Sequence, residues 1–196
     1  HLFGDVDTVF CSASTQETPL IEDVPIFGKA HLDVEDTWHA IIRFANGIET
    51  TWAYSRTSPG TPLRNAIYYG SKGSMRDLGY PFHCFQGGGE ALLADGTTVS
   101  SDTIVEEYLT TLSAEQKAKL FPYGITHDVG IEIWDFINAV RTGQPPEMDG
   151  EAGLRARALC EACFESDAIG QPVSYQDVLN GTLSTFQEPI DTYWGL

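Results

Sequence analysis

Cysteine and histidine pairs are the residues of this sequence with the clearest potential for metal or redox chemistry. Cys160 and Cys163 have the two-residue separation found in many zinc and thiol–disulfide sites. A structural zinc site takes four ligands, and only His83 and Cys84 offer a second pair. The residues around Cys160 are mainly Ala, Leu and Phe, which favours a helix whose cysteines pack as small apolar groups. We therefore expect no metal site, and four cysteines in 196 residues are too few for a disulfide scaffold.

A glycine run at residues 87–89 is the one stretch that resembles a phosphate-binding loop. A pyrophosphate site needs a glycine-rich turn that opens a helix, and no helical pattern follows this run. The sequence also contains no P-loop, no G-x-S-x-G and no H-E-x-x-H. We expect a loop at 87–89, no cofactor-binding residue on this chain and no complete catalytic apparatus.

The charge of the chain restricts its partners. It has 28 acidic and 11 basic residues, which gives a net charge of −17. Such a surface repels phosphate backbones and anionic lipids, so we expect neither a nucleic-acid nor a membrane partner. No apolar run approaches the roughly 20 residues that span a bilayer, and the start has no signal-peptide pattern. Sparse cysteines fit a reducing compartment, so we expect a soluble, cytoplasmic protein.

The first half of the chain alternates between apolar and polar residues, as strands do. Asn46-Gly47 and Asp95-Gly96 are strong hairpin signals. A stretch with two prolines, residues 15–36, predicts a loop or a long excursion. The alternation predicts strands at 5–13, 36–45, 48–56, 64–69, 74–77, 82–85 and 91–93.

Helical periodicity dominates the second half. Residues 126–141 carry one apolar stripe, with Thr126 as a candidate N-cap and Gly143 just beyond the end. A helix at 150–168 should begin after Asp149 and end before Gly170. The remaining helices are expected at 101–112, at 114–120 and, as the last element, from Ser174 to Asn180-Gly181.

Strands followed by helices predict a single α+β domain over residues 1–196, with a mostly antiparallel open sheet and helices packed on one face. The helices at 126–142 and 150–169 should cover that face. The uncovered face should carry large side chains such as Trp38 or Trp52. An apolar face of that kind is typical of a partner surface.

Several motifs together resemble one known family. The segment 38–47 and the segment Tyr68-Tyr69-Gly70-Ser71-Lys72-Gly73 are similar to the "RFxNG … YGxxG" core of the Gfo/Idh/MocA oxidoreductase C-terminal domain. Residues 132–146 resemble its "E…DFxxAIRxGxPP" helix, and residues 149–154 with 165–173 resemble its "DGxxGL … ES…GxPV" helix. The order and spacing of these motifs over residues 36–173 support the resemblance.

The resemblance implies a two-part enzyme. Family members join an N-terminal Rossmann domain, which holds NAD or NADP, to a sheet domain, and they oxidise or reduce a sugar, inositol or related polyol. This chain would be the C-terminal substrate-binding and oligomerisation half, a piece of a longer protein that forms homo-oligomers through its open sheet face. The catalytic lysine would lie in the missing half. His1 is too close to Gly4 to be the family's catalytic histidine, so no catalytic residue is assigned.

The resemblance also places two segments at the substrate pocket. One carries Tyr54 and Arg56 at a strand end, and the other carries Tyr123 and His127 at a helix start. A phenol and a guanidinium donate well to sugar hydroxyls or a carboxylate, and a histidine can also shuttle a proton. Simpler roles remain open: Tyr54 as a packing aromatic, Arg56 as a surface cation and His127 as a helix-start residue.

Two other functions remain open from the sequence. The chain could be a stand-alone, non-catalytic sugar-binding or assembly module of the same fold, or an unrelated α+β binding domain. The length of the natural reading frame distinguishes them, because the enzyme requires roughly 120–150 further residues with a glycine-rich strand–turn–helix.

Overall fold

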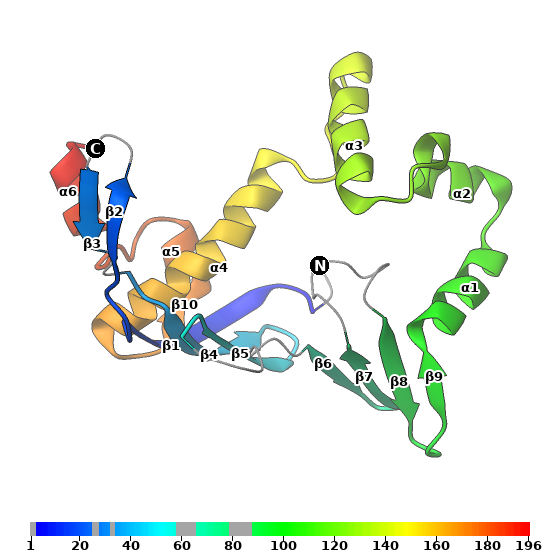
Figure 1. Cartoon of the computed structure of the whole chain (residues 1–196), viewed down its shortest axis with the longest axis horizontal. Helices are drawn as coiled ribbons and strands as arrows, with labels where there is room; N and C mark the ends of the chain where they lie inside the picture. Colours follow the sequence, from blue (N-terminus) through cyan, green and yellow to red (C-terminus); the bar gives the residue numbers. More distant parts are fainter. Residues whose placement is uncertain (1–2, 25–27, 32–33, 58–65, 79–87) are drawn as a thin grey trace. The chain divides into compact units, whose positions relative to one another are not determined.

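A computed structural model of the chain describes residues 3–24, 28–31, 34–57, 66–78 and 88–196 (Figure 1). The chain divides into two compact units, one formed by residues 1–63 and 148–196 and the other by residues 64–147. The expectation of a single domain over residues 1–196 stays a prediction.

The first unit is built on a four-stranded antiparallel sheet with the order β10-β1-β4-β5. Its strands are β1 (Val6–Ser14), β4 (Thr37–Phe44), β5 (Glu49–Ser55) and β10 (Val173–Ser174). Val9 and Cys11 are buried while Phe10 between them is exposed, which is the alternation that the sequence predicts. The three long strands and their antiparallel pairing are thus confirmed.

One face of this sheet is covered by α4 (Gly150–Ile169), which lies along β1 (Figure 1). Alanines and a cysteine on α4, Ala158, Ala162 and Cys163, are buried and let the helix approach the strands closely. The Asp149 carboxylate accepts a hydrogen bond from the Ala152 amide at 2.8 Å and so caps the helix. These features confirm the predicted start of this helix.

Strand register decides which side chains share that face. Trp38 is paired with Tyr54 and Ala40 with Trp52 across β4 and β5, so all four point to the same side as the buried Ile42. Trp38 packs against the buried core, and both tryptophans line a cavity together with residues of α4. The expectation that the uncovered face carries Trp38 or Trp52 is therefore wrong.

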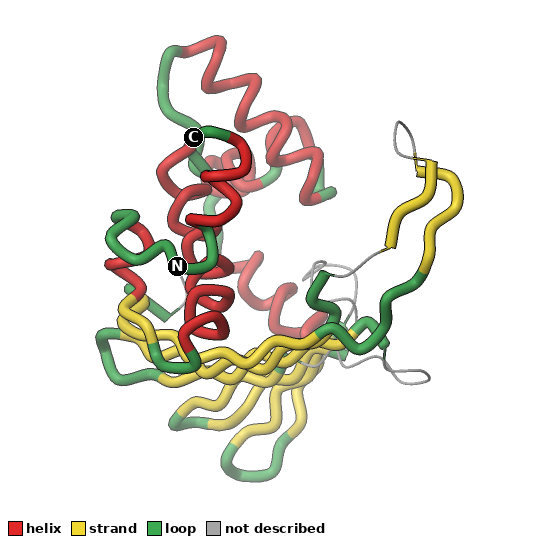
Figure 2. The backbone as a smooth tube through the Cα atoms, turned by 90° about the vertical axis from the view of Figure 1, so that its left-hand side faces the viewer, coloured by secondary structure: helices red, strands yellow, loops and turns green. Residues whose placement is uncertain are grey.

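The structure gives detail to one predicted segment, the loop or long excursion at 15–36, and corrects another. Residues 15–36 contain a hairpin of β2 (Leu20–Val24) and β3 (Gly28–His31), which stands apart from the four-stranded sheet in both overall views (Figures 1 and 2). Pro19 directly precedes β2 and so does not interrupt the ladder. The helix that follows Ser174, α5 (Tyr175–Leu179), is not the last one, because α6 (Glu188–Trp194) follows it.

The second unit contains another antiparallel sheet, in the order β6-β7-β8-β9. Its elements are β6 (Ile67–Gly70), β7 (Gly73–Asp77), β8 (Gly89–Leu93), β9 (Thr98–Ser100), α1 (Ser101–Thr111), α2 (Ala114–Leu120), a 3-10 turn at Pro122–Gly124 and α3 (Asp128–Thr142). The strand expected at 82–85 lies outside the described residues. The other expected elements of this unit are confirmed, with boundaries shifted by a few residues.

Helix α3 begins one residue later than predicted, since its N-cap is His127 and not Thr126. Gly143 ends it in the left-handed conformation, with φ 69°. The predicted apolar stripe is exposed, from 48% at Val129 to 72% at Val140. That α3 covers the main sheet stays a prediction, whereas α4 does cover it.

The described residues thus form open antiparallel sheets with helices, the α+β class that the sequence predicts. Across the parts of the chain that the structure describes, every helix is too short or too polar to cross a bilayer.

Candidate functional site

The four predicted substrate-binding residues fall into two pairs. Tyr54 and Arg56 lie at the end of β5 in the first unit, and Tyr123 and His127 lie before α3 in the second. The members of each pair are near neighbours in the sequence. A single pocket that contains all four residues stays a prediction.

Tyr54 is held by other aromatic rings. Its ring stacks on Trp38 with centroids 4.3 Å apart and an interplanar angle of 24°. Trp38 also contacts Trp52 edge to face at 5.5 Å. Aromatic pairs of this kind add about 0.5–1.5 kcal/mol beyond area burial, so Tyr54 has a packing role. A role of its hydroxyl toward a substrate stays a prediction.

Arg56 directly follows β5, and its backbone amide donates to the Asp36 carbonyl at 2.9 Å. Its side chain is exposed and lines a cavity of about 130 Å³ with Glu17, Glu35 and Asp36. Among the described residues, no carboxylate forms an ion pair with the Arg56 guanidinium. The guanidinium therefore remains able to bind an acceptor on a small molecule.

Asp36 fixes the backbone around Arg56, a role that the sequence analysis missed. Its buried carboxylate accepts hydrogen bonds from the Gln16 amide at 2.9 and 3.1 Å, the Glu17 amide at 2.9 Å and the Thr37 hydroxyl at 3.0 Å. Burial raises the pKa of this carboxyl, but the Glu17, Thr37 and Gln16 hydrogen bonds outweigh it and leave the pKa below its ordinary value. The charged form of Asp36 thus ties residues 16–17 to the start of β4.

Tyr123 stands out by its backbone. Its φ of 55° lies in the left-handed region that non-glycine residues rarely adopt, and its side chain is 80% exposed. Its ring meets Trp134 of α3 edge to face at 4.8 Å. Strained backbone of this kind clusters at functional sites, which makes the turn at Tyr123 a candidate site position.

His127 is exposed at the N-terminus of α3. Its Nδ1 lies 3.2 Å from the Asp128 carboxylate, which also accepts from the Val129 amide at 2.8 Å. This contact orients the imidazole ring. The other ring nitrogen, Nε2, can therefore exchange a hydrogen bond with a ligand.

The described residues offer little for metal or cofactor chemistry. Within the described ranges, no group of three or more His, Cys, Asp or Glu side chains could hold a metal ion. Cys160 and Cys163 lie on α4, whereas His83 and Cys84 lie outside the described residues. Gly88 leads into strand β8 and not into a helix, so this glycine run does not fit a dinucleotide pyrophosphate.

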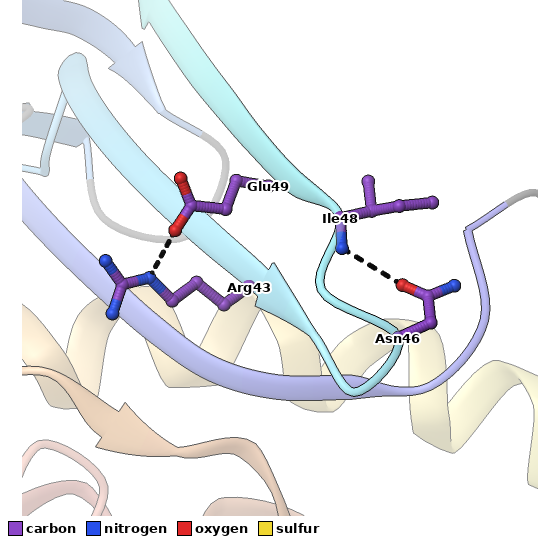
Figure 3. A network of polar contacts seen from close by, with 4 residues as sticks. All are labelled: Arg43, Asn46, Ile48 and Glu49. Carbon is purple, nitrogen blue, oxygen red and sulfur yellow. Dashed lines mark hydrogen bonds and ion pairs between the residues drawn. The ribbon is translucent and has the colours of Figure 1, made fainter. Parts of the chain in front are cut away.

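The motif residues that carry the family resemblance hold the fold together. The Asn46 side-chain oxygen accepts a hydrogen bond from the Ile48 amide at 3.1 Å, and Gly47 has φ 85°. Together they form the tight turn between β4 and β5. The Arg43–Glu49 ion pair of 2.7 Å lies beside this turn (Figure 3). Gly73 passes so close to β8 that a Cβ there would lie 2.3 Å from the Leu92 carbonyl oxygen. Asn46, Gly47 and Gly73 therefore each have a backbone reason for their place in the motif.

Glu165 and Ser166, the "ES" pair near the end of α4, also hold backbone segments in place. Ser166 accepts a hydrogen bond from the Cys11 amide at 2.9 Å and donates to the Gln171 carbonyl at 2.7 Å. Glu165 is buried and accepts from the Phe186 and Gln187 amides at 3.0 and 3.3 Å. These side chains connect α4 to β1 and to the chain that leads into α6.

Comparison with solved structures finds the same fold in several oxidoreductases. An oxidoreductase from Agrobacterium radiobacter in complex with NAD+, L-tartaric acid and magnesium is 20% identical with a TM-score of 0.57, over 89% of this chain and 44% of that chain. Levoglucosan dehydrogenase in complex with NADH and L-sorbose is 20% identical with a TM-score of 0.57, over 87% and 45%. The WlbA dehydrogenase from Bordetella pertussis with NADH and UDP-GlcNAcA is 22% identical with a TM-score of 0.54, over 88% and 43%.

At these identities the structural likeness establishes the fold, and the chain spans less than half the length of these enzymes. No curated protein matches the sequence. The sequence profile described as "Oxidoreductase family, C-terminal alpha/beta domain" matches residues 1–175. The chain therefore belongs to the Gfo/Idh/MocA oxidoreductase family, in which it corresponds to the C-terminal alpha/beta domain.

Proposed function

We propose that this chain is the C-terminal substrate-binding and oligomerisation half of an NAD(P)-dependent oxidoreductase that acts on a sugar, inositol or related polyol. The family match over residues 1–175 carries the proposal. The complexes of levoglucosan dehydrogenase with L-sorbose and of WlbA with UDP-GlcNAcA support a sugar or sugar-derived substrate.

The cofactor, NAD or NADP, binds in this proposal to another part of the longer protein. The observation that supports this is the glycine run that leads into β8 instead of opening a helix. Calorimetric titration of the 196-residue chain with NADH and NADPH should give no binding. Micromolar binding by the isolated chain would contradict the proposal that the cofactor binds to another part of the longer protein.

The chain's own contribution is to bind and orient the polyol. Arg56 donates to substrate oxygens from the end of β5, where Asp36 and the β4 pairing hold its backbone. Tyr54 adds a hydroxyl beside it, and Tyr123 with His127 supplies donors from the start of α3. Donors fixed by the fold contribute to rate by positioning the reacting carbinol.

Substitution in the full-length enzyme tests this assignment. Arg56→Ala should lower kcat/KM by roughly ten- to a hundredfold, since a lost charged hydrogen bond is worth about 1.5–3 kcal/mol. His127→Ala should lower it by roughly two- to tenfold, since a lost neutral hydrogen bond is worth about 0.5–1.5 kcal/mol. The thermal midpoint should change little because both side chains are exposed. Arg76→Ala is the matched control, because it removes an exposed arginine that pairs with Glu90 on the second sheet. Wild-type kinetics for both site variants would overturn the residue assignments and leave the family membership intact.

Self-association through the uncovered face of the main sheet is the second part of the proposal. Phe10 and Ile41 are cross-strand neighbours on that face and are 39% and 44% exposed. The surrounding positions are polar and include the Arg43–Glu49 ion pair (Figure 3). An apolar centre with a polar rim is the usual anatomy of an interface between copies of one chain.

Sedimentation at micromolar concentration tests the interface. The wild-type protein should sediment as an oligomer, and Ile41→Glu should shift it toward monomer because a buried carboxylate is costly. Leu154→Glu, on an exposed position of α4, is the matched control and should leave the assembly unchanged. A wild-type monomer, or equal behaviour of the two variants, would refute association through this face.

A further inference from the structure

Three cysteines lie around one cavity between the main sheet and α4. The cavity has a volume of about 310 Å³. Cys11 of β1 and Cys160 and Cys163 of α4 line it, together with Trp38 and Phe164. Cys11 and Cys163 are buried, and Cys160 is half-buried. The fold thus gathers thiols that stand about 150 positions apart in the sequence.

Cys11 and Cys163 belong to the same buried core cluster and line the same cavity, and the interaction between their thiols shifts the pKa of both. The backbone is also drawn together here, since the Cys11 amide donates to the hydroxyl of Ser166, three residues beyond Cys163 on α4. A disulfide requires two such sulfur atoms on closely packed backbones. The two cysteines therefore lie on packed elements, β1 and α4, which a disulfide would connect.

The two thiols are not equivalent. The hydrogen bond from Cys163 lowers the pKa of Cys11, against the effects of burial and of the Asp167 charge, and a backbone hydrogen bond from His39 lowers it further. The same contact with Cys11, together with burial, raises the pKa of Cys163. Because a thiolate is the nucleophile in thiol oxidation, Cys11 is the thiol that an oxidant attacks first.

We propose that Cys11 and Cys163 form an oxidation-sensitive pair that a peroxide converts into a disulfide between β1 and α4. In the first step the Cys11 thiolate attacks one peroxide oxygen, the O–O bond breaks, and Cys11 sulfenic acid and hydroxide form. In the second step the Cys163 sulfur attacks the Cys11 sulfur, the S–O bond breaks, and water leaves with the Cys163 proton. The two sulfurs lose two electrons in total, and the peroxide gains them.

The cavity gives a small oxidant a place beside the thiols. The rings of Trp38 and Phe164 line this space beside the thiols. Cys160 lies one helical turn from Cys163 and is not hydrogen-bonded to Cys11, so it should remain reduced.

Peptide mapping of the full chain after treatment with hydrogen peroxide tests the pair. Free thiols are blocked with iodoacetamide, and trypsin then releases Cys11 in residues 1–29 and both α4 cysteines in residues 158–196. A further cut after Glu161 separates Cys160 from Cys163. The expected product links the Cys11 peptide to the Cys163 peptide with the loss of two hydrogen atoms, while Cys160 carries the block.

The disulfide should also raise the thermal midpoint by roughly 5 °C or more, because it closes a long loop in the unfolded chain. Dithiothreitol should reverse the rise, and Cys163→Ala should abolish it, whereas Cys160→Ala should preserve it. The mapping on wild-type protein requires no variant to fold. A Cys160–Cys163 link, a link between two chains, or Cys11 that stays fully reduced would each overturn the proposal.

Discussion

The hydroxyl of Ser166 offers a sharp test of how α4 closes the edge of β1. Strand β10 pairs only with Thr8 and Val9, so the later amides of β1 on that side need other acceptors. The Ser166 hydroxyl serves the Cys11 amide at 2.9 Å, and the Asp167 carboxylate serves the Ala13 amide at 2.7 Å. Two helix side chains thus continue the hydrogen bonding of a strand edge.

Ser166→Ala removes one of these acceptors at a position with no exposure. An orphaned buried amide costs about 1–3 kcal/mol, and alanine recovers about 0.5 kcal/mol through its higher helix propensity. The carbonyl of Gln171 can turn to water because Gln171 is exposed. We therefore expect the free energy of unfolding to fall by about 1–2 kcal/mol.

Urea unfolding measures the global effect, and hydrogen exchange of the Cys11 amide measures the local one. The Cys11 amide should exchange about tenfold faster for each 1.4 kcal/mol lost. Ser12→Ala, on the exposed face of the same strand, is the control and should change stability by less than about 0.5 kcal/mol. If Ser166→Ala and Ser12→Ala behave alike in both assays, the edge-capping argument fails.

The remaining predictions concern one carboxylate and two glycines. The lowered pKa of Asp36 means that its contribution to stability is present above the unfolded value of 3.8 and disappears as pH falls through the lower folded pKa. Asp36→Asn should therefore melt at a lower temperature than wild type at pH 7, and this difference in thermal midpoint should shrink as the pH falls. Asp7→Asn, at an exposed position, is the control and should melt at the wild-type temperature. Gly170→Ala should cost about 1 kcal/mol in urea unfolding because φ is 66° there. Gly153→Ala, inside α4 with open space around it, should instead stabilise by about 0.5–1 kcal/mol, and equal signs would contradict this reasoning.

The candidate site was only partly accessible from the sequence. Local patterns predicted Arg56 at the end of a strand and His127 near a helix start, and the structure places Arg56 directly after β5 and His127 at the N-cap of α3. The part played by Asp36 was not predictable, because the amides that it binds lie 19 and 20 residues away. The sequence around Tyr123 does not indicate its left-handed backbone, because the glycine that marks a turn there is the following residue, Gly124.

The sequence by itself determined the elements whose signals are local. Asn46-Gly47 specified a hairpin, and Asp149 and Gly170 bounded α4, because caps and turns depend on a few neighbouring residues. Only the tertiary structure decided that Trp38 and Trp52 share the face under α4, and that Glu165 holds the chain before α6. The first outcome depends on strand register and on helix packing between residues more than 100 positions apart. The second depends on a hydrogen bond between residues 21 positions apart, Glu165 and Phe186. No local sequence pattern carries that information.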